Sequence, residues 1–217
     1  YDAQAGTVTA AAATAQQLAG ENVADGAILS VAQFEKGVES FDFKTAVGYF
    51  RVDVTFDDIT SIIVKGANIA GTATFNAAGV VQSISEGANQ VTLTPAGDTF
   101  AKDKSYYVAL LPGTSPAGEF SVMLTRAENE ALEMTATKAI EIPRNGGFFL
   151  ADYKLVKKLV IKDAASLQKF LATAHTLAAS EEVEVTADID LQGVELTGAT
   201  SFAGTLVGNG HSLLNWT

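Results

Sequence analysis

Few side chains in this sequence are of the types that do acid–base, nucleophilic or metal chemistry, and they are scattered. The chain contains two histidines, His175 and His211, and no cysteine. Thiol nucleophiles, disulfides and cysteine-ligated metals are therefore excluded. His175 falls in a helical pattern and His211 follows the turn at 208–210, so we predict ordinary structural roles for both. No serine lies in the context of a hydrolase nucleophile, and we predict no catalytic residue.

Asp188 and Asp190 flank Ile189, which places both carboxylates on one side of an expected strand. Two interpretations stay open for them. They bind Ca²⁺ if other oxygens converge on the same point, or they accept hydrogen bonds from turn amides, which is the commoner use of such aspartates. We predict no metal site and no cofactor. Asp57 and Asp58 follow a strong strand and are predicted to be turn residues.

Acidic residues outnumber basic ones by 25 to 14, which gives a formal net charge of −11. Glycoside hydrolysis needs two carboxylates facing each other across a cleft, but nothing in the sequence selects such a pair. The small basic cluster does not form the stripe that a nucleic-acid site needs, so we predict no nucleic-acid partner. The cluster is predicted to be a solvated strand face and consists of Lys154, Lys157, Lys158 and Lys162. A solvated strand edge is predicted for Glu181, Glu182 and Glu184.

Aromatic residues do not form an evident sugar-binding platform. Tyr106 and Tyr107 lie in one strand-like run and Phe148 and Phe149 in another, so one residue of each pair is expected to point inward. Trp216, the only tryptophan, is expected to cover the open end of the last coil or, alternatively, to contact a ligand.

The elements that position these residues are mostly short strands. The run GYFRVDVTF alternates, with Phe50, Val52, Val54 and Phe56 on the inner side. Similar runs follow at strand spacing: TSIIVKG, IAGTATF, VVQSIS, QVTLTP, SYYVALLPG, EFSVMLT, LEMTATKAIEI and GGFFLADY. Turns are predicted at NAAG, PAGD and PGTSPAG. Many short strands separated by turns, with no strand–helix alternation, predict an all-β fold with an antiparallel β-sandwich.

Both ends of the chain differ from this pattern. The alanine-rich segment Tyr1–Gly26 fits either a helix or an extended edge strand. Near residue 152 the character changes to a strand followed by one helix, which Asp163 or Ser166 is predicted to cap. Its apolar stripe consists of Leu167, Phe170, Leu171, Ala174 and Ala178. We therefore predict two domains, a sandwich over 1–152 and a helix-capped first coil of a β-helix over 153–217.

The stretch Ala27–Leu155 resembles the fimbrillin-like surface proteins of Bacteroidetes, the family of the type V pilus subunits. The resemblance rests on SFDFKTAVGYFRVDVTF, ITSIIVKGANIAGTATFN, VTLTPAGDTFAKDKSYYVALLPGT, EFSVMLT and KAIEIPRNGGFFLADY in that order. It contains no active-site signature. For pilus subunits it implies assembly by strand exchange after arginine-specific trimming of an N-terminal segment. Here no arginine precedes Arg51, so either trimming has already happened or this member does not polymerise in that way.

The segment after residue 165 resembles the opening of glycine-rich β-helices in bacterial surface proteins. In order, the matching residues are Asp188, Asp190, Leu191, Phe202, Gly204, Gly208, Gly210 and His211. One coil is present where the family has several, and a single coil does not bury its own apolar face. We therefore expect either that the chain is a piece of something longer or that the coil packs on what precedes it.

Together the two resemblances imply an exported bacterial protein at the cell surface or outer membrane, with no enzymatic activity. The expected role is adhesion, or that of an accessory subunit of a pilus. The expected partners are a host or bacterial surface glycan or protein, and other pilus subunits by strand exchange. Attachment to the outer membrane is expected if a lipid anchor lies upstream of Tyr1. The alternative is that the chain is the presenting part of a longer β-helix protein that binds or degrades polysaccharides.

Overall fold

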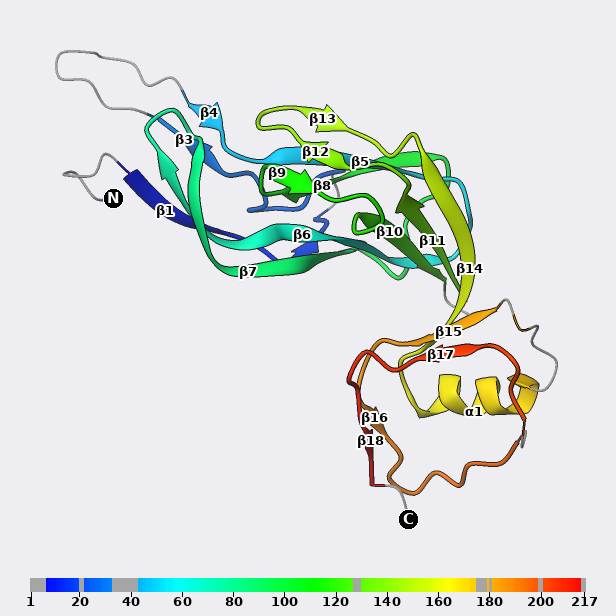
Figure 1. Ribbon diagram of the computed structural model, residues 1–217. Helices are drawn as coiled ribbons and strands as arrows, with labels where there is room; N and C mark the ends of the chain where they lie inside the picture. The colour runs from blue at the N-terminus through cyan, green and yellow to red at the C-terminus, as the bar shows by residue number, and fades with distance from the viewer. Residues whose placement is uncertain are drawn as a thin grey trace, which may run out of the picture. The chain divides into compact units, whose positions relative to one another are not determined.

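The structure is a computed structural model that describes residues 7–19, 22–32, 43–126, 130–174, 179, 181–198 and 201–215 (Figure 1). These residues form mostly β-strands, with one helix among them, so the all-β fold class is confirmed. The chain divides into two compact units. The first consists of Tyr1–Leu124 and Met134–Lys154, and the second of Thr125–Glu133 and Leu155–Thr217.

The first unit contains mainly strands that precede residue 150. They are β1 (Thr7–Ala12), β2 (Ala15–Gln17), β3 (Ser30–Val31), β4 (Lys44–Thr45), β5 (Gly48–Val54), β6 (Ile59–Asn76), β7 (Val81–Thr94), β8 (Lys104–Leu110), β9 (Gly113–Ser115), β12 (Ile140–Ile142) and β13 (Gly147–Phe148). Three further strands contribute residues to both units: β10 (Ser121–Arg126), β11 (Glu130–Ala136) and β14 (Tyr153–Ile161).

The longest strands, β6 and β7, form an antiparallel hairpin. The prediction of four short strands here was wrong, because no turn interrupts either run. The pairing register shifts between Lys65 and Ala70 and again between Ala70 and Thr72. Gly66 and Gly71 therefore lie at irregularities inside one long strand and not in turns between short strands. Gly71 has φ = 113°, a conformation that side chains with a Cβ rarely adopt. The predicted turn at Asn76–Gly79 is confirmed, since the Gly79 N–H donates to the Asn76 carbonyl at 2.8 Å.

A second sheet of the first unit has the order β13-β5-β8. Its strand β5 alternates as predicted: Phe50, Val52 and Val54 are buried, and Arg51 is exposed. Phe56 is 42% exposed, contrary to the prediction, because the strand ends at Val54 and the alternation ends with it. Strand β8 pairs with β5 in antiparallel fashion, whereas β13 pairs with it in parallel.

Helix and strand were both open for the N-terminal segment, and its described residues 7–19 contain two strands and no helix. β1 pairs with β6 in antiparallel fashion from Thr7 opposite Asn76 to Ala12 opposite Gly71. β2 pairs with β7 in parallel. Threonine and valine favour a strand, and pairing with β6 overrides the helix propensity of the alanines in β1.

The second unit is built on parallel pairing. Its remaining strands are β15 (Glu182–Val185), β16 (Ile189–Asp190), β17 (Thr205–Val207) and β18 (Leu213–Leu214). β14, β15 and β17 are hydrogen-bonded in that order as parallel neighbours, and β16 pairs with β18 in parallel (Figure 1). The offset between paired residues is 23 from Val183 to Leu206 and 24 from Ile189 to Leu213. Two successive turns of chain therefore stack on each other.

Helix α1 (Ala164–Thr173) covers the apolar face of this stack. Its residues Leu167 and Phe170 pack in one buried cluster with Ile161, Val183 and Ile189. Both predicted capping residues are used. The Asp163 carboxylate accepts a hydrogen bond from the Ser166 amide at 2.7 Å, and the Ser166 hydroxyl accepts one from the Asp163 amide at 3.0 Å. This reciprocal capping box fixes the start of the helix.

Candidate functional site

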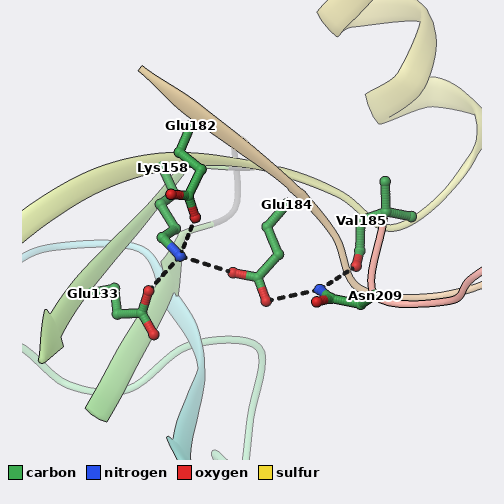
Figure 2. Close-up of polar contacts among 6 residues, drawn as sticks. All are labelled: Glu133, Lys158, Glu182, Glu184, Val185 and Asn209. Carbon is green, nitrogen blue, oxygen red and sulfur yellow. Dashed lines mark hydrogen bonds and ion pairs between the residues drawn. The ribbon is translucent and has the colours of Figure 1, made fainter. Parts of the chain in front are cut away.

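The most tightly organised group of charged side chains lies in the second unit, around Lys158 (Figure 2). The Lys158 Nζ atom is 2.5 Å from a carboxylate oxygen of Glu133, 2.5 Å from one of Glu182 and 3.4 Å from one of Glu184. The Lys158 side chain is 11% exposed, and the side chains of Glu133 and Glu184 are 10% and 4% exposed. One ammonium group thus sits among three carboxylates, largely out of water. We call these four residues the Lys158 cluster.

Parallel register brings the cluster together. Lys158 pairs with Glu182, and Val160 pairs with Glu184, so these side chains share one face of the strands. The opposite face carries Ile161 and Val183, which pack under helix α1. The predictions of a solvated lysine face and a solvated glutamate edge were therefore wrong for Lys158 and Glu184.

The electrostatics favour a charged lysine. Burial lowers the pKa of Lys158, but its hydrogen bonds to Glu133 and Glu182 and the negative charges of Glu133 and Glu184 outweigh burial and raise the pKa well above its usual value of 10.5. A permanently protonated amine cannot act as a nucleophile or a general base. The cluster therefore serves as an ion-pair network that joins β11, β14 and β15.

Asn209 extends the network to the turn that follows β17. Its side-chain amide donates to a Glu184 carboxylate oxygen at 3.0 Å and to the Val185 carbonyl at 2.9 Å (Figure 2). Asn209 has φ = 50°, a left-handed conformation that asparagine tolerates better than most residues. The same residue thus shapes the turn of one layer and binds the preceding layer.

Asp188 and Asp190 bind groups of the following layer and of a local turn. Asp188 Oδ1 accepts from the Ser212 amide at 2.9 Å and lies 3.3 Å from His211 Nδ1. Asp190 Oδ1 accepts from the Asn215 side chain at 2.7 Å and from the Gln192 amide at 3.0 Å.

These contacts also set the charge state of the two aspartates. The amide of Ser212 and the His211 ring lower the pKa of Asp188, and Asn215 and the Gln192 amide lower the pKa of Asp190. Within the described part of the chain, no group of three histidine, aspartate or glutamate side chains is placed to hold a metal ion.

In the second unit, strands β17 and β18 carry exposed leucines at the positions where their ladder partners β15 and β16 carry buried apolar residues. Val183 and Ile189 are 0% exposed, whereas Leu206 and Leu213, their partners in the parallel ladders, are 54% and 44% exposed. Leu214 is also 45% exposed. Among the described strands, β17 ends its sheet and β18 pairs only with β16. We call β17 and β18, with these three leucines, the open edge.

The aromatic pairs of the first unit point in opposite directions, as predicted. Tyr106 is buried, and the Phe148 ring lies 5.2 Å from that of buried Phe50. Phe149 is 57% exposed, and the Arg51 guanidinium lies 5.2 Å from its ring centroid. This surface cation–π pair contributes about 0.5–1 kcal/mol.

A cavity of about 200 Å³ lies beside the N-terminal strand of the first unit. Its walls are largely apolar and include Val8 and Ala10 of β1, Leu29, Val31 and Phe75 of β6. Beneath it, Ala12, Ala73 and Phe75 belong to one buried cluster. The described residues that line the cavity carry no charge, so it suits apolar side chains rather than a polar substrate.

Three residues singled out by the sequence, His175, Ala178 and Trp216, lie outside the described residues. Asp58 has φ = 63° directly before β6 and Asp57 binds Lys102 at 2.8 Å, in keeping with the predicted turn between β5 and β6. Sequence reasoning missed the Lys158 cluster. Its only local signal is that Glu182 and Glu184 alternate with apolar Val183 and Val185, and that Lys158 precedes the apolar run of β14.

Comparisons with known proteins identify no relative: no family model, no curated protein and no solved structure matches this chain. Helix α1, the helix of the described residues, is too short and too polar to cross a bilayer.

Proposed function

We propose that this protein is a non-catalytic, exported cell-surface protein that acts in adhesion or as an accessory subunit of a bacterial pilus. In this proposal the first unit is a fimbrillin-like β-sandwich and the second is the helix-capped start of a β-helix. The proposed partners are a surface glycan or protein, and pilus subunits that exchange strands with this chain. The observation that carries the proposal is the pairing of β1 with β6 along the wall of the cavity.

Strand β1 is suited to replacement. It adds six residues, TVTAAA, to the edge of β6, and five of its six side chains are partly or fully exposed. Removing it would leave the backbone of residues 71–76 without a partner on the side opposite β7 and would uncover Phe75 and Ala73. A donor strand with larger apolar side chains would fill the cavity and gain about 25 cal/mol for each Å² of apolar surface it buries. Exchange is therefore favourable for a donor that packs better than β1.

A disulfide that locks β1 tests the exchange. Thr9 and Thr74 are cross-strand partners whose hydroxyl oxygens are 3.3 Å apart, so the pair Thr9→Cys and Thr74→Cys has suitable geometry in a chain without other cysteines. A fluorescent peptide that copies β1 with larger apolar residues at Val8 and Ala10 serves as the donor. We expect the reduced variant to incorporate the peptide, as measured by native mass spectrometry, and the oxidised variant to exclude it.

The matched control is the pair Thr72→Cys and Ser85→Cys, which joins β6 to β7 and leaves β1 free. We expect this pair to incorporate peptide in both redox states. Equal incorporation into the reduced and oxidised Thr9/Thr74 variant would contradict strand exchange. For adhesion itself, a glycan array and a panel of matrix proteins provide the assay, and an absence of binding to both would count against this part of the proposal.

The parallel ladders of the second unit favour a second candidate function. In it, the chain is the N-terminal presenting part of a longer β-helix protein that binds or degrades polysaccharides. Release of reducing ends from polysaccharides by the full-length gene product, but not by residues 1–217 alone, would support this candidate over the first.

A further inference from the structure

The open edge presents backbone hydrogen-bonding groups of β17 and β18 that point away from the strands already paired with them. In a parallel ladder, alternate residues direct their N–H and C=O groups to the same neighbour. The Thr205 amide donates to the Glu181 carbonyl at 3.1 Å, so Thr205 and Val207 face β15. The backbone N–H and C=O of Leu206 therefore point away from β15.

The second ladder repeats this arrangement. The Ser212 and Leu214 carbonyls accept hydrogen bonds from the Ile189 and Leu191 amides at 2.9 Å each. The N–H and C=O of Leu213 consequently point away from β16. Leu206 and Leu213 thus present both a half-exposed apolar side chain and a backbone donor and acceptor at the same edge.

We infer that β17 and β18 are a template on which a third parallel coil, tethered to the same polypeptide, folds. The inference rests on the β-helix architecture proposed above and is independent of the exchange proposed for β1. A third coil with apolar residues 23–24 positions after Leu206 and Leu213 would bury these leucines as fully as Val183 and Ile189 are buried one coil earlier. It would also satisfy the outward backbone groups of both strands at once.

The size of the edge excludes an untethered occupant. β17 and β18 contain three and two residues, and a contact with so few residues buries far less than the roughly 1,200 Å² typical of stable complexes. A second copy or a free peptide would therefore associate only weakly. Tethering removes this limit, because the effective concentration of a linked segment reaches roughly millimolar.

An appended coil provides the test. Residues 194–217 are repeated directly after Thr217 in the full chain, which places a second copy of both leucines 24 positions further on. Hydrogen exchange, followed by mass spectrometry or NMR, reports on the Leu206 and Leu213 amides. We expect their exchange to slow by about tenfold or more relative to the unextended chain, because each amide gains a hydrogen bond.

Two variants separate templating from a general effect of the added chain. In one, both copied leucines of the appended coil are aspartate, and we expect no protection. In the other, Leu206→Asp, we expect an unchanged Tm in the unextended chain and loss of protection in the extended chain. Fast exchange at both amides of the extended chain would overturn the inference. A stable dimer of the unextended chain that Leu206→Asp dissociates would also overturn it, by showing that a second copy is the occupant.

Discussion

Replacement of Lys158 by methionine is the perturbation with the largest expected effect on the second unit. Methionine keeps most of the side-chain volume but removes the ammonium group that Glu133 and Glu184, 10% and 4% exposed, share. Removing one partner of a buried ion pair costs about 3–5 kcal/mol, because the remaining charge is desolvated and uncompensated. For a cooperative unit of about 60–100 residues each kcal/mol lowers the Tm by roughly 4–8 °C, so we expect a fall of roughly 12 °C or more.

The matched control is Lys157→Met, one residue earlier in the same strand. The Lys157 side chain is 60% exposed and lies 2.9 Å from Glu130. Exposed pairs contribute about 0–1 kcal/mol, so this variant should unfold within a few degrees of the parent. Circular dichroism during heating measures both. Equal Tm values for the two variants would refute the argument that burial makes the Lys158 cluster strong.

The pH dependence provides a second readout of the same prediction. The folded-state pKa of Lys158 is raised above 10.5. Its contribution to stability is therefore complete below that pH and is lost only in stronger alkali. Between about pH 6 and pH 9, the contribution of the Lys158 cluster to the stability of the parent chain should therefore stay constant. The deficit of Lys158→Met relative to the parent should therefore stay constant over this range, as measured by urea titration at several pH values. A deficit that shrinks within this range would contradict a lysine that stays charged.

Three further substitutions, one of them with a matched control, test local features of the fold. Asp163→Ala removes the helix cap and should cost about 1 kcal/mol. The Ser166 amide lowers the pKa of Asp163 below its ordinary 3.8, so the loss should appear above that pH and vanish as acid protonates the carboxylate, as seen by urea titration at several pH values. Gly71→Ala should destabilise the fold by more than about 2 kcal/mol, because the backbone there has φ = 113° and the new Cβ would lie 2.4 Å from a carbonyl oxygen. The control is Gly97→Ala, whose new Cβ has no atom within 4 Å and which should be neutral. Thermal unfolding measures both. Asn209→Gly keeps the left-handed turn but removes two hydrogen bonds, and should cost about 1–2 kcal/mol by chemical denaturation; an unchanged midpoint would mean that the turn does not bind the preceding layer.

Local patterns in the sequence predicted the local features well. The alternation of Phe50, Val52 and Val54 identified a half-buried strand, and Asp163 with Ser166 identified the start of the helix. These features depend on residues two to four positions apart, which a linear pattern contains. The same reasoning failed where a pattern ends, as at Phe56, and where a glycine marks an irregularity inside a long strand rather than the end of a short one, as at Gly66.

The sequence by itself determined that this chain is β-rich, acidic and without cysteine, with one capped helix near its C-terminal third. Only the tertiary structure decided which charged residues are buried. Lys157 and Lys158 are adjacent and identical in type, yet one is solvated and the other lies among three carboxylates, one of them 26 residues away. The register of parallel strands makes that choice. The hydrophobic patterns of paired strands and the turns between them set this register together, so it depends on segments distant in sequence and not on one segment alone.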